Sequence, residues 1–133
     1  MLVDTSVWID YFNGYRSPEA DYLANAIDAA RPIIIPGIVL TEILLGLRNE
    51  AEAARIADLL SAFDPAPNPS RNDYIEAATI YRQCRSQGFT IRSTVDCLIA
   101  QICLRNQFPL LTKDRDFKAI TRCRRLNVVD ANG

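Results

Sequence analysis

Histidine is absent from this chain of 133 residues, and its absence removes several familiar kinds of active site. Without histidine there is no Ser-His-Asp triad, no Cys-His nucleophile pair and no histidine general base, and most catalytic zinc sites also depend on it. Any chemistry that this chain performs must therefore come from carboxylates, hydroxyls or arginines.

Closely spaced cysteines are missing as well. The four cysteines, Cys84, Cys97, Cys103 and Cys123, contain no C-x-x-C pair. Because structural zinc is bound by closely spaced ligand pairs, this spacing argues against a zinc site. We expect buried free thiols instead.

Long apolar runs are also absent. No stretch approaches the roughly 18 apolar residues that a membrane-spanning helix needs. The first residues, MLVDTSVWIDYF, lack the basic segment and the uninterrupted apolar stretch of a secretory signal. We therefore expect no membrane association and a cytoplasmic location. The apolar fraction of 49% and the net charge of -1 are typical of a folded chain, and the length fits one domain over residues 1–133.

Lysine is scarce, with 2 lysines against 13 arginines. Arginine binds phosphates and carboxylates through two parallel hydrogen bonds, so this bias favours a nucleic-acid or acidic partner. A genome rich in G and C would produce the same bias, and the two explanations have similar weight. With a pI near 5.4, any basic surface must be local.

Short apolar strands alternate with helical patterns along the chain. Helical periodicity or capping signals are found from Pro18 onward, from Leu40 to Leu47 and after Ser93. The expected strands are Val3 with its neighbours, residues 33–35, 108–112 and 126–129, and the segment PAPNP at 65–69 is an expected loop. This alternation predicts a three-layer α/β/α domain, in which helices cover both faces of a short-stranded parallel sheet.

Acidic residues follow two of the expected strands. Asp4 comes directly after the first strand, and Asp114 and Asp116 follow the strand that ends at Thr112. Each of these acids could simply cap a helix. However, parallel strands bring their carboxyl ends to one edge of the sheet, so these acids should be neighbours.

Two further acids lie in helical segments. Asp96, in STVDCLIA, could form a capping box with Ser93, but the residues beside it on the helix are apolar or small. Glu42, in GIVLTEILLG, also has mainly apolar neighbours, and an unpaired ionised carboxylate there would cost several kcal/mol or so. Either a salt bridge to an arginine or a cation shared with the aspartates would stabilise Glu42.

A hard cation would suit this set of acids. Mg²⁺ and Mn²⁺ prefer carboxylate oxygens and water, and they need no histidine. Without a metal, converging carboxylates repel each other and their pKa values rise. Thr5, Ser6 and Thr112 are placed to support the acids or to position water.

The stretches DTSVWIDYF, TEILLG, STVDCLIA and LLTKDRDF, taken together and in this order, resemble the PIN-domain ribonucleases, in particular the VapC-like toxins of type II toxin-antitoxin systems. The stretches lie between residues 4 and 117. The resemblance implies a compact α/β/α fold and an endoribonuclease that depends on Mg²⁺ or Mn²⁺ and acts on tRNA or rRNA. It also implies a homodimer that a small VapB-like antitoxin inhibits.

The resemblance also assigns the site. The first acid of the family corresponds to Asp4, its helical glutamate to Glu42 and its third acid to Asp96. Both Asp114 and Asp116 fall in the region of the fourth acid. We assign Asp4, Asp96 and Asp114 to the metal, and Glu42 to the attacking water or a second ion. We assign Asp116 to a helix cap or to outer support of the metal ligands. Thr5, with Ser6 beside it, corresponds to the hydroxyl residue that follows the first acid in the family. Arg92 could contact RNA or the antitoxin, or it could be a solvated surface residue.

Two other functions compete with this hypothesis. A phosphoacceptor receiver domain also gathers aspartates and Mg²⁺ at strand ends, and Lys113 would suit it, although Glu42 and Asp96 would then have no role. The other possibility is a metal-free interaction domain in which the acids are only caps and salt bridges. Dependence of stability and cleavage on metal separates these functions.

Overall fold

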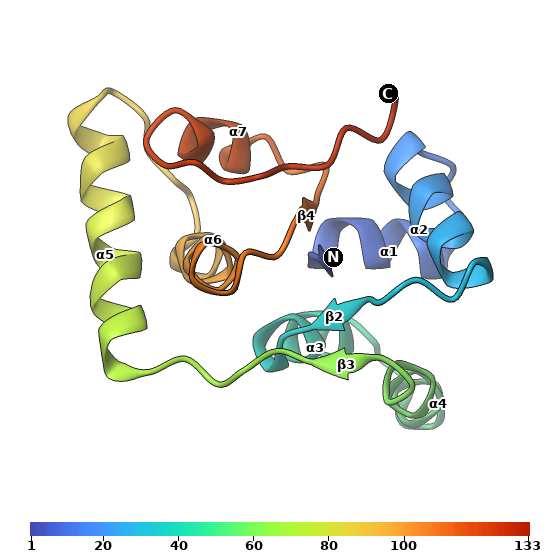
Figure 1. The fold of residues 1–133 in the computed structure, drawn as a ribbon. Coiled ribbons are helices and arrows are strands. Elements are labelled where there is room, and N and C mark those ends of the chain that lie inside the picture. Colours follow the sequence, from blue (N-terminus) through green and yellow to red (C-terminus); the bar gives the residue numbers. More distant parts are fainter.

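The parallel sheet that the sequence predicts is present, and its strands are very short. In the computed structural model, which describes residues 1–133, the strand order is β3-β2-β1-β4 and every pair is parallel (Figure 1). Leu2 pairs with Ile34 on one side and with Leu110 on the other, so β1 is a central strand. The strands are Leu2–Val3 (β1), Ile34–Ile35 (β2), Asp64–Pro65 (β3) and Leu110–Leu111 (β4).

Seven helices connect the strands and cover both faces of the sheet, which confirms the three-layer α/β/α prediction. α6 packs against α5 and α7 on one side, and α1, α2 and α4 lie on the other side (Figure 1). α3 follows β2 and packs against α1 and α4. The helices are Thr5–Asn13 (α1), Pro18–Asp28 (α2), Gly37–Leu45 (α3), Glu50–Leu60 (α4), Arg71–Ser86 (α5), Thr94–Asn106 (α6) and Asp116–Thr121 (α7).

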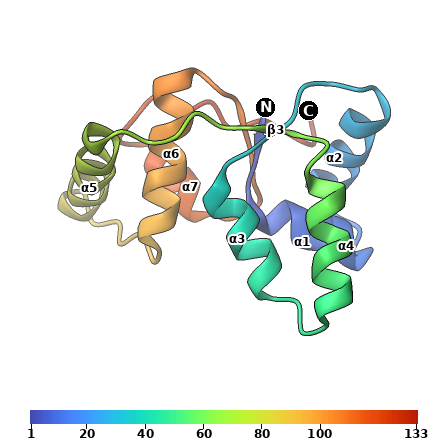
Figure 2. The same cartoon turned by 90° about the horizontal axis from the view of Figure 1, so that it is seen from below.

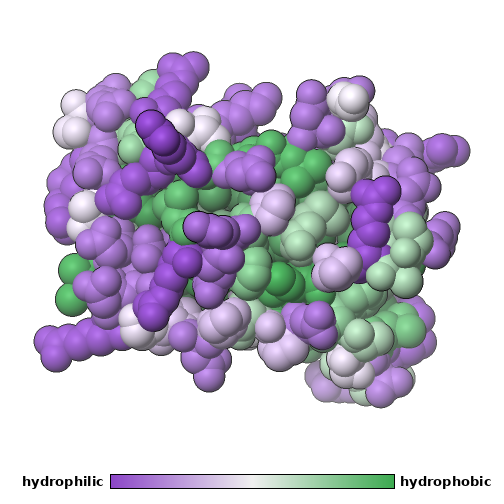
Figure 3. Space-filling view, in the orientation of Figure 1, coloured by the Kyte–Doolittle hydropathy of each residue, from purple (hydrophilic) through white to green (hydrophobic).

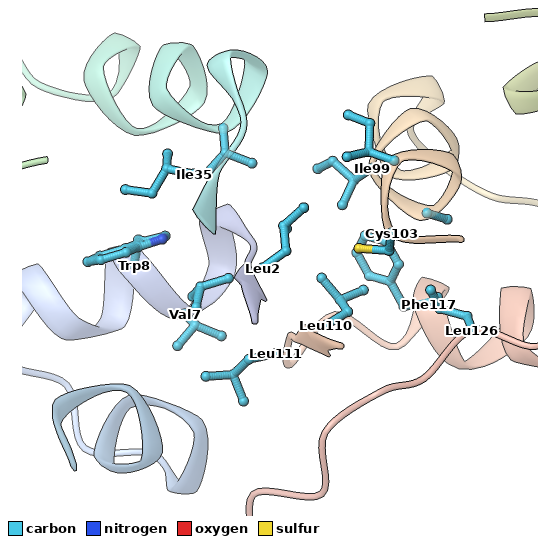
Figure 4. Packing of buried hydrophobic residues seen from close by; sticks show 14 of the residues in the cluster. Leu2, Val7, Trp8, Ile35, Ile99, Cys103, Leu110, Leu111, Phe117 and Leu126 are labelled. Atoms are coloured by element: carbon cyan, nitrogen blue, oxygen red, sulfur yellow. The ribbon is translucent and has the colours of Figure 1, made fainter. Parts of the chain in front are cut away.

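The hydrophobic core occupies both faces of the sheet. Leu110 and Leu111 point to opposite faces, because successive residues of a strand alternate (Figure 4). Trp8 of α1 packs on one face, and Ile99 of α6 and Phe117 of α7 pack on the other (Figure 4). Burial of each such side chain contributes about 1.5–3 kcal/mol. These contacts hold two-residue strands in register that could not persist alone.

Local signals in the sequence explain several helix ends. Ser17 caps α2, because its Oγ accepts a hydrogen bond from the N–H of Ala20 at 3.0 Å. Gly14 ends α1 with a φ of 68°, a left-handed conformation that glycine adopts without strain. Gly88 follows α5 with a φ of 88° and plays the same role there.

Two strand predictions need correction. The segment at 65–69 is not entirely loop, because Asp64–Pro65 forms the edge strand β3, where a proline is tolerated since no neighbour needs its N–H. Residues 126–129 do not form a strand, and only Val128 makes an isolated parallel bridge to Leu110. The pattern of apolar residues marks a segment that touches the sheet, but not how many hydrogen bonds it makes.

The apolar residues of α6 are not all buried. Ile99 and Ile102 are buried, but Val95 and Leu98 are only half-buried and line a hollow beside α5. Gln101 is buried although it is polar, and so are several small residues of the same helix. The reason is that α6 is packed between the sheet and α5, so most of its circumference is enclosed.

The cysteines are free thiols, as expected. Cys97 and Cys103 are buried, and so is Cys84, whose Sγ lies 3.2 Å from that of the partly buried Cys123. None of the helices combines the length and the hydropathy that crossing a bilayer would require. Apolar side chains lie across the centre of the face seen in Figure 3, and hydrophilic side chains surround them.

Candidate active site

The predicted acids gather at the carboxyl edge of the sheet. Seen from below, α1 and α3 lead away from the strands toward the same side (Figure 2). Asp4 follows β1 and Asp114 follows the neighbouring strand β4, while Glu42 lies in α3 and Asp96 in the first turn of α6. Asp116 is the first residue of α7. The topology therefore brings together acids that are as far as 112 positions apart in the chain (116 minus 4).

Asp4 is held by hydroxyl groups. It is 4% exposed, and its Oδ1 and Oδ2 accept hydrogen bonds from Ser6 Oγ at 2.6 Å and Thr112 Oγ1 at 2.7 Å. Asp4 stands at the N-cap of α1, and the two hydroxyl groups are the side-chain partners of its carboxylate. Burial raises the pKa of Asp4 to about 6, against the opposing effect of the two hydroxyl groups.

Asp96 has no hydrogen-bond partner for its carboxylate. The expected capping box with Ser93 is not formed, because Ser93 Oγ accepts from the N–H of Val95 and Asp96 does not reach back. The side chain is half-buried. Its burial, followed by repulsion from Asp114 and Asp4, raises the pKa of Asp96 to about 7.

Arg92 bridges the two acids that follow β4. Its Nε lies 3.2 Å from Asp116 Oδ2, and its Nη2 lies 3.4 Å from Asp114 Oδ1. The backbone N–H of Arg92 also donates to Asp116 Oδ2. Arg92 is therefore not merely a solvated surface residue. Asp116 does not cap α7, because it is the first helical residue after the N-cap Arg115 and its carboxylate accepts from Arg92 instead.

Glu42 is joined to the N-terminal segment by a hydroxyl group. Thr5 Oγ1 donates a hydrogen bond of 2.7 Å to Glu42 Oε1, and no arginine or lysine forms a salt bridge with Glu42. The alternative of an arginine salt bridge is therefore wrong. Glu42 also adds to the repulsion that raises the pKa of Asp96, so it belongs to the same acidic group.

The donor set fits a hard divalent cation. One carboxylate oxygen from each of Asp96, Asp114 and Asp116 lies within 4.8 Å of the others, and Asp4 and Glu42 are close enough to act on Asp96 electrostatically. All the donors are carboxylate oxygens, which Mg²⁺ and Mn²⁺ prefer. The partnerless carboxylate of Asp96 is the feature that a cation would satisfy best.

Lys113 points away from this group of acids. Its Nζ lies 2.6 Å from Asp10 Oδ2 and 4.9 Å from the centre of the Tyr15 ring. A receiver domain would need this lysine among the acids, so its position speaks against that alternative.

Two sets of ion pairs in and near the site could not be predicted from the sequence. The pairing of Arg92 with Asp114 and Asp116 depends on how the loop before α6 lies against α7, and no local sequence pattern indicates it. The same is true of the Lys113–Asp10 ion pair. By contrast, Ser6 and Thr112 could be found because they stand directly beside or after predicted strand ends.

The chain matches the family model of the PIN domain over residues 1–122. It is 32% identical over 124 residues to VapC ribonuclease Mb1587 of Mycobacterium bovis and, to the same extent, to Ribonuclease VapC11 of Mycobacterium tuberculosis H37Rv. In each comparison the aligned region covers 92% of this chain and 92% of the relative.

Solved structures share the fold at lower identity. The structure of VapBC-1 from nontypeable Haemophilus influenzae matches with a TM-score of 0.74 and 19% identity, covering 99% of this chain and 98% of that chain. A toxin-antitoxin complex from Klebsiella pneumoniae matches with a TM-score of 0.71 and 23% identity, covering 98% and 96%. With the acids gathered at one edge of the expected sheet, these matches establish that the chain belongs to the PIN-domain family, among the VapC ribonucleases.

Proposed function

We propose that this chain is an endoribonuclease toxin that needs Mg²⁺ or Mn²⁺ to cleave phosphodiester bonds in RNA, with tRNA or rRNA as targets in the cytoplasm. The observation that carries the proposal is the half-buried, partnerless carboxylate of Asp96 among four other acids, all of which raise its pKa. Such repulsion persists in a fold only where something offsets it, and a bound cation does so directly.

Each acid has a proposed role. Asp4, Asp96 and Asp114 hold the metal, and Asp116 supports Asp114 through the N–H that it donates. Glu42, held by Thr5, orients the attacking water. The hydroxyl groups of Ser6 and Thr112 keep Asp4 oriented with both oxygens fixed.

When bound, the metal would lower the pKa of a coordinated water and stabilise the charge that develops on the phosphate. The protein's part is to hold the acids ionised and in place, and to receive the phosphate. Arg92 is suited to this second task, because its side chain is 66% exposed and its guanidinium would be released from Asp114 once a cation neutralised that acid.

The proposed partners follow from the relatives. The solved neighbours from Haemophilus influenzae and Klebsiella pneumoniae are toxin-antitoxin complexes, which supports a VapB-like antitoxin as the inhibitor of this chain. We also propose that the toxin is a homodimer of single-domain protomers. The positive charge of Arg92 can pair with a carboxylate of the antitoxin as well as with a phosphate of RNA.

The proposal is tested by titrating Mn²⁺ into the wild type and Asp96→Asn by calorimetry, and by assaying cleavage of a structured RNA with the same samples. We expect the wild type to bind metal and to cleave, and Asp96→Asn to lose both. Asp28→Asn, an exposed acid at the end of α2, is the matched control and should behave as the wild type.

Other outcomes would distinguish the competing functions. Metal binding without cleavage would favour a metal-dependent signalling module. If neither occurs, the acids serve only the fold and its interactions, with Arg92 as their permanent counter-charge. If Asp4→Asn and Asp96→Asn still cleave RNA at the wild-type rate, the assignment of the site is wrong.

A further inference from the structure

A cationic surface lies directly beside the acids and has no role in the site described above. Loop 88–90 and α7 enclose a hollow of about 320 Å³, and Asp116 forms part of its wall. Arg115, Lys118 and Arg122 also line it, and all three are exposed. Because Asp116 belongs both to the hollow and to the acidic group, the two sites are continuous.

These three cations form a row along α7. Lys118 lies in the helix, and Arg115 and Arg122 are its N-cap and C-cap residues, both with helical backbone angles, so spacings of three and four residues place all three on one side. None of them lies within 4.0 Å of a carboxylate oxygen. Arg122 instead lies over the ring of Phe89, with its guanidinium carbon 4.9 Å from the ring centre. The row therefore presents positive charge that no acid of the chain neutralises.

The acidic group makes such a row useful. Before a cation binds, five carboxylates repel the phosphates of any strand that approaches them, and Arg92, which pairs with Asp114 and Asp116, is the one cation in salt-bridge contact with them. The net charge of the whole chain is -1, so attraction for a polyanion must come from a local surface. The cations of α7 are the unpaired ones that share a hollow with one of these acids.

We propose that this hollow binds backbone phosphates of the single-stranded RNA segment that flanks the cleaved bond. Arg115, Lys118 and Arg122 contact successive phosphates, so that the strand leaves the acids along α7. This inference rests on the proposed ribonuclease function and adds a path for the substrate beyond the metal centre. Contacts to phosphate fix the position of a strand without selecting its sequence, so the surface positions RNA and does not choose it.

The test measures binding separately from cleavage. Affinity for a fluorescent single-stranded RNA oligonucleotide is measured by anisotropy at several salt concentrations, with Asp96→Asn in every protein so that the RNA stays intact. We expect Lys118→Ala/Arg122→Ala to bind roughly tenfold more weakly, and the slope of log affinity against log salt to become shallower by about 0.7 for each phosphate that the protein no longer neutralises. Lys118→Ala alone should show about half of the effect on the logarithmic scale.

Arg31→Ala/Arg71→Ala is the matched control. Both arginines are exposed and lack an acidic partner. Arg31 precedes β2 and therefore lies at the amino-terminal ends of the strands, whereas the acids lie at the carboxyl ends. Arg71 begins α5, about 24 Å from the end of that helix that leads into loop 88–90. This control should bind RNA with the affinity and the salt slope of the parent protein.

Two failures can be told apart. If the double variant and the control bind RNA equally, the inference is overturned. The same result is expected if the surface along α7 binds an acidic protein segment instead of RNA. If the wild type cleaves RNA while this equality holds, the ribonuclease function survives and only the surface is wrong. If the wild type neither binds nor cleaves RNA, both proposals fail. Lys118→Ala protects against a folding artefact, because Lys118 lacks the aromatic contact that Arg122 makes.

Discussion

Ionised Asp96 destabilises the folded chain when no metal is bound. Its carboxylate is half-buried and has repulsive neighbours and no hydrogen-bond donor, so ionisation is unfavourable in the folded chain. A group whose pKa is raised from 3.8 to about 7 binds its proton more tightly in the folded state than in the unfolded state. The metal-free protein therefore loses stability as the pH rises from about 4 to 7.

We predict that Asp96→Asn stabilises the metal-free protein, because the amide cannot ionise. At pH 8 the free energy of unfolding should rise by roughly 1–2 kcal/mol, a value reduced to allow for the partial exposure of the side chain. At pH 5 the gain should be much smaller. Urea denaturation with a chelator at both pH values measures this, and a variant that is less stable than the wild type at pH 8 would show that repulsion does not dominate at this position.

Arg92 is a counter-charge that a metal would have to replace. We predict that Arg92→Ala binds Mn²⁺ more tightly, by about two- to thirtyfold, because two exposed ion pairs of about 0.2–1 kcal/mol each no longer compete for Asp114 and Asp116. Calorimetric titration measures the affinity, and Arg55→Ala, which loses an ion pair remote from these acids, is the control. Unchanged or weaker metal binding would mean that Arg92 orients the acids.

The acids that gather at this edge of the sheet and their hydroxyl partners can be predicted from the sequence, whereas the pairing with Arg92 cannot. Asp4 and Asp114 follow strands, and the fold class alone brings strand ends together. Glu42 and Asp96 are conspicuous because their helical neighbours are apolar or small. The pairing of Arg92 with Asp116 across 24 positions depends on where a loop settles, which local propensity does not determine.

At the scale of elements, the buried acid Asp73 joins the start of α5 to α6. Its spacing of three residues from Ser70 is a local signal for a capping box. Ser70 and Asp73 form the capping box that the sequence instead suggested at Ser93. Asp73 also accepts hydrogen bonds from Gln101 and Arg105 of α6. The hydrogen bond from the N–H of Ser70, more than any other contact, lowers the pKa of Asp73 to about 2.

We predict that this acid stabilises the junction of α5 and α6 in a pH-dependent way. A lowered pKa means that the contribution is complete above about pH 5 and is lost as the pH falls toward 2. Asp73→Asn should therefore cost on the order of 1–2 kcal/mol at pH 7, a value reduced because Arg105 is exposed, and almost nothing at pH 2. Chemical denaturation across this range measures the difference, and a cost that does not vary with pH would assign the effect to packing.

Most helices could be predicted from caps and periodicity, but the sheet could be predicted only in outline. Ser17 with Pro18 and Gly88 after α5 are local signals, so they survive whatever the tertiary structure does. β3 has no such signal, because Asp64 and Pro65 are poor strand residues that are recruited by pairing with β2. The segment around Val128 shows the converse, since its backbone hydrogen bonds reach only Leu110 and it makes a single bridge rather than a strand.

At the scale of the whole molecule, Asp4 and Asp96, which come from segments far apart in the chain, titrate as a coupled pair. Burial and repulsion raise the pKa of Asp4 to about 6 and that of Asp96 to about 7, and protonation of one affects the other. A cation that binds ionised carboxylates must displace these protons. Metal affinity should therefore rise as the pH increases through 6 and 7, and become constant above about pH 8.

We predict that Mn²⁺ binding releases about one proton at pH 6.5 and almost none at pH 8.5, as follows from two groups with these pKa values. Calorimetry in buffers with different ionisation enthalpies counts the protons, and Asp96→Asn should abolish most of the release together with the affinity. A hundredfold excess of Mn²⁺ over its Kd should also stabilise the fold by about 2.7 kcal/mol. Metal binding that releases no proton at pH 6.5 would mean that the ion binds elsewhere, because no ion can join these acids without removing the protons that their crowding retains.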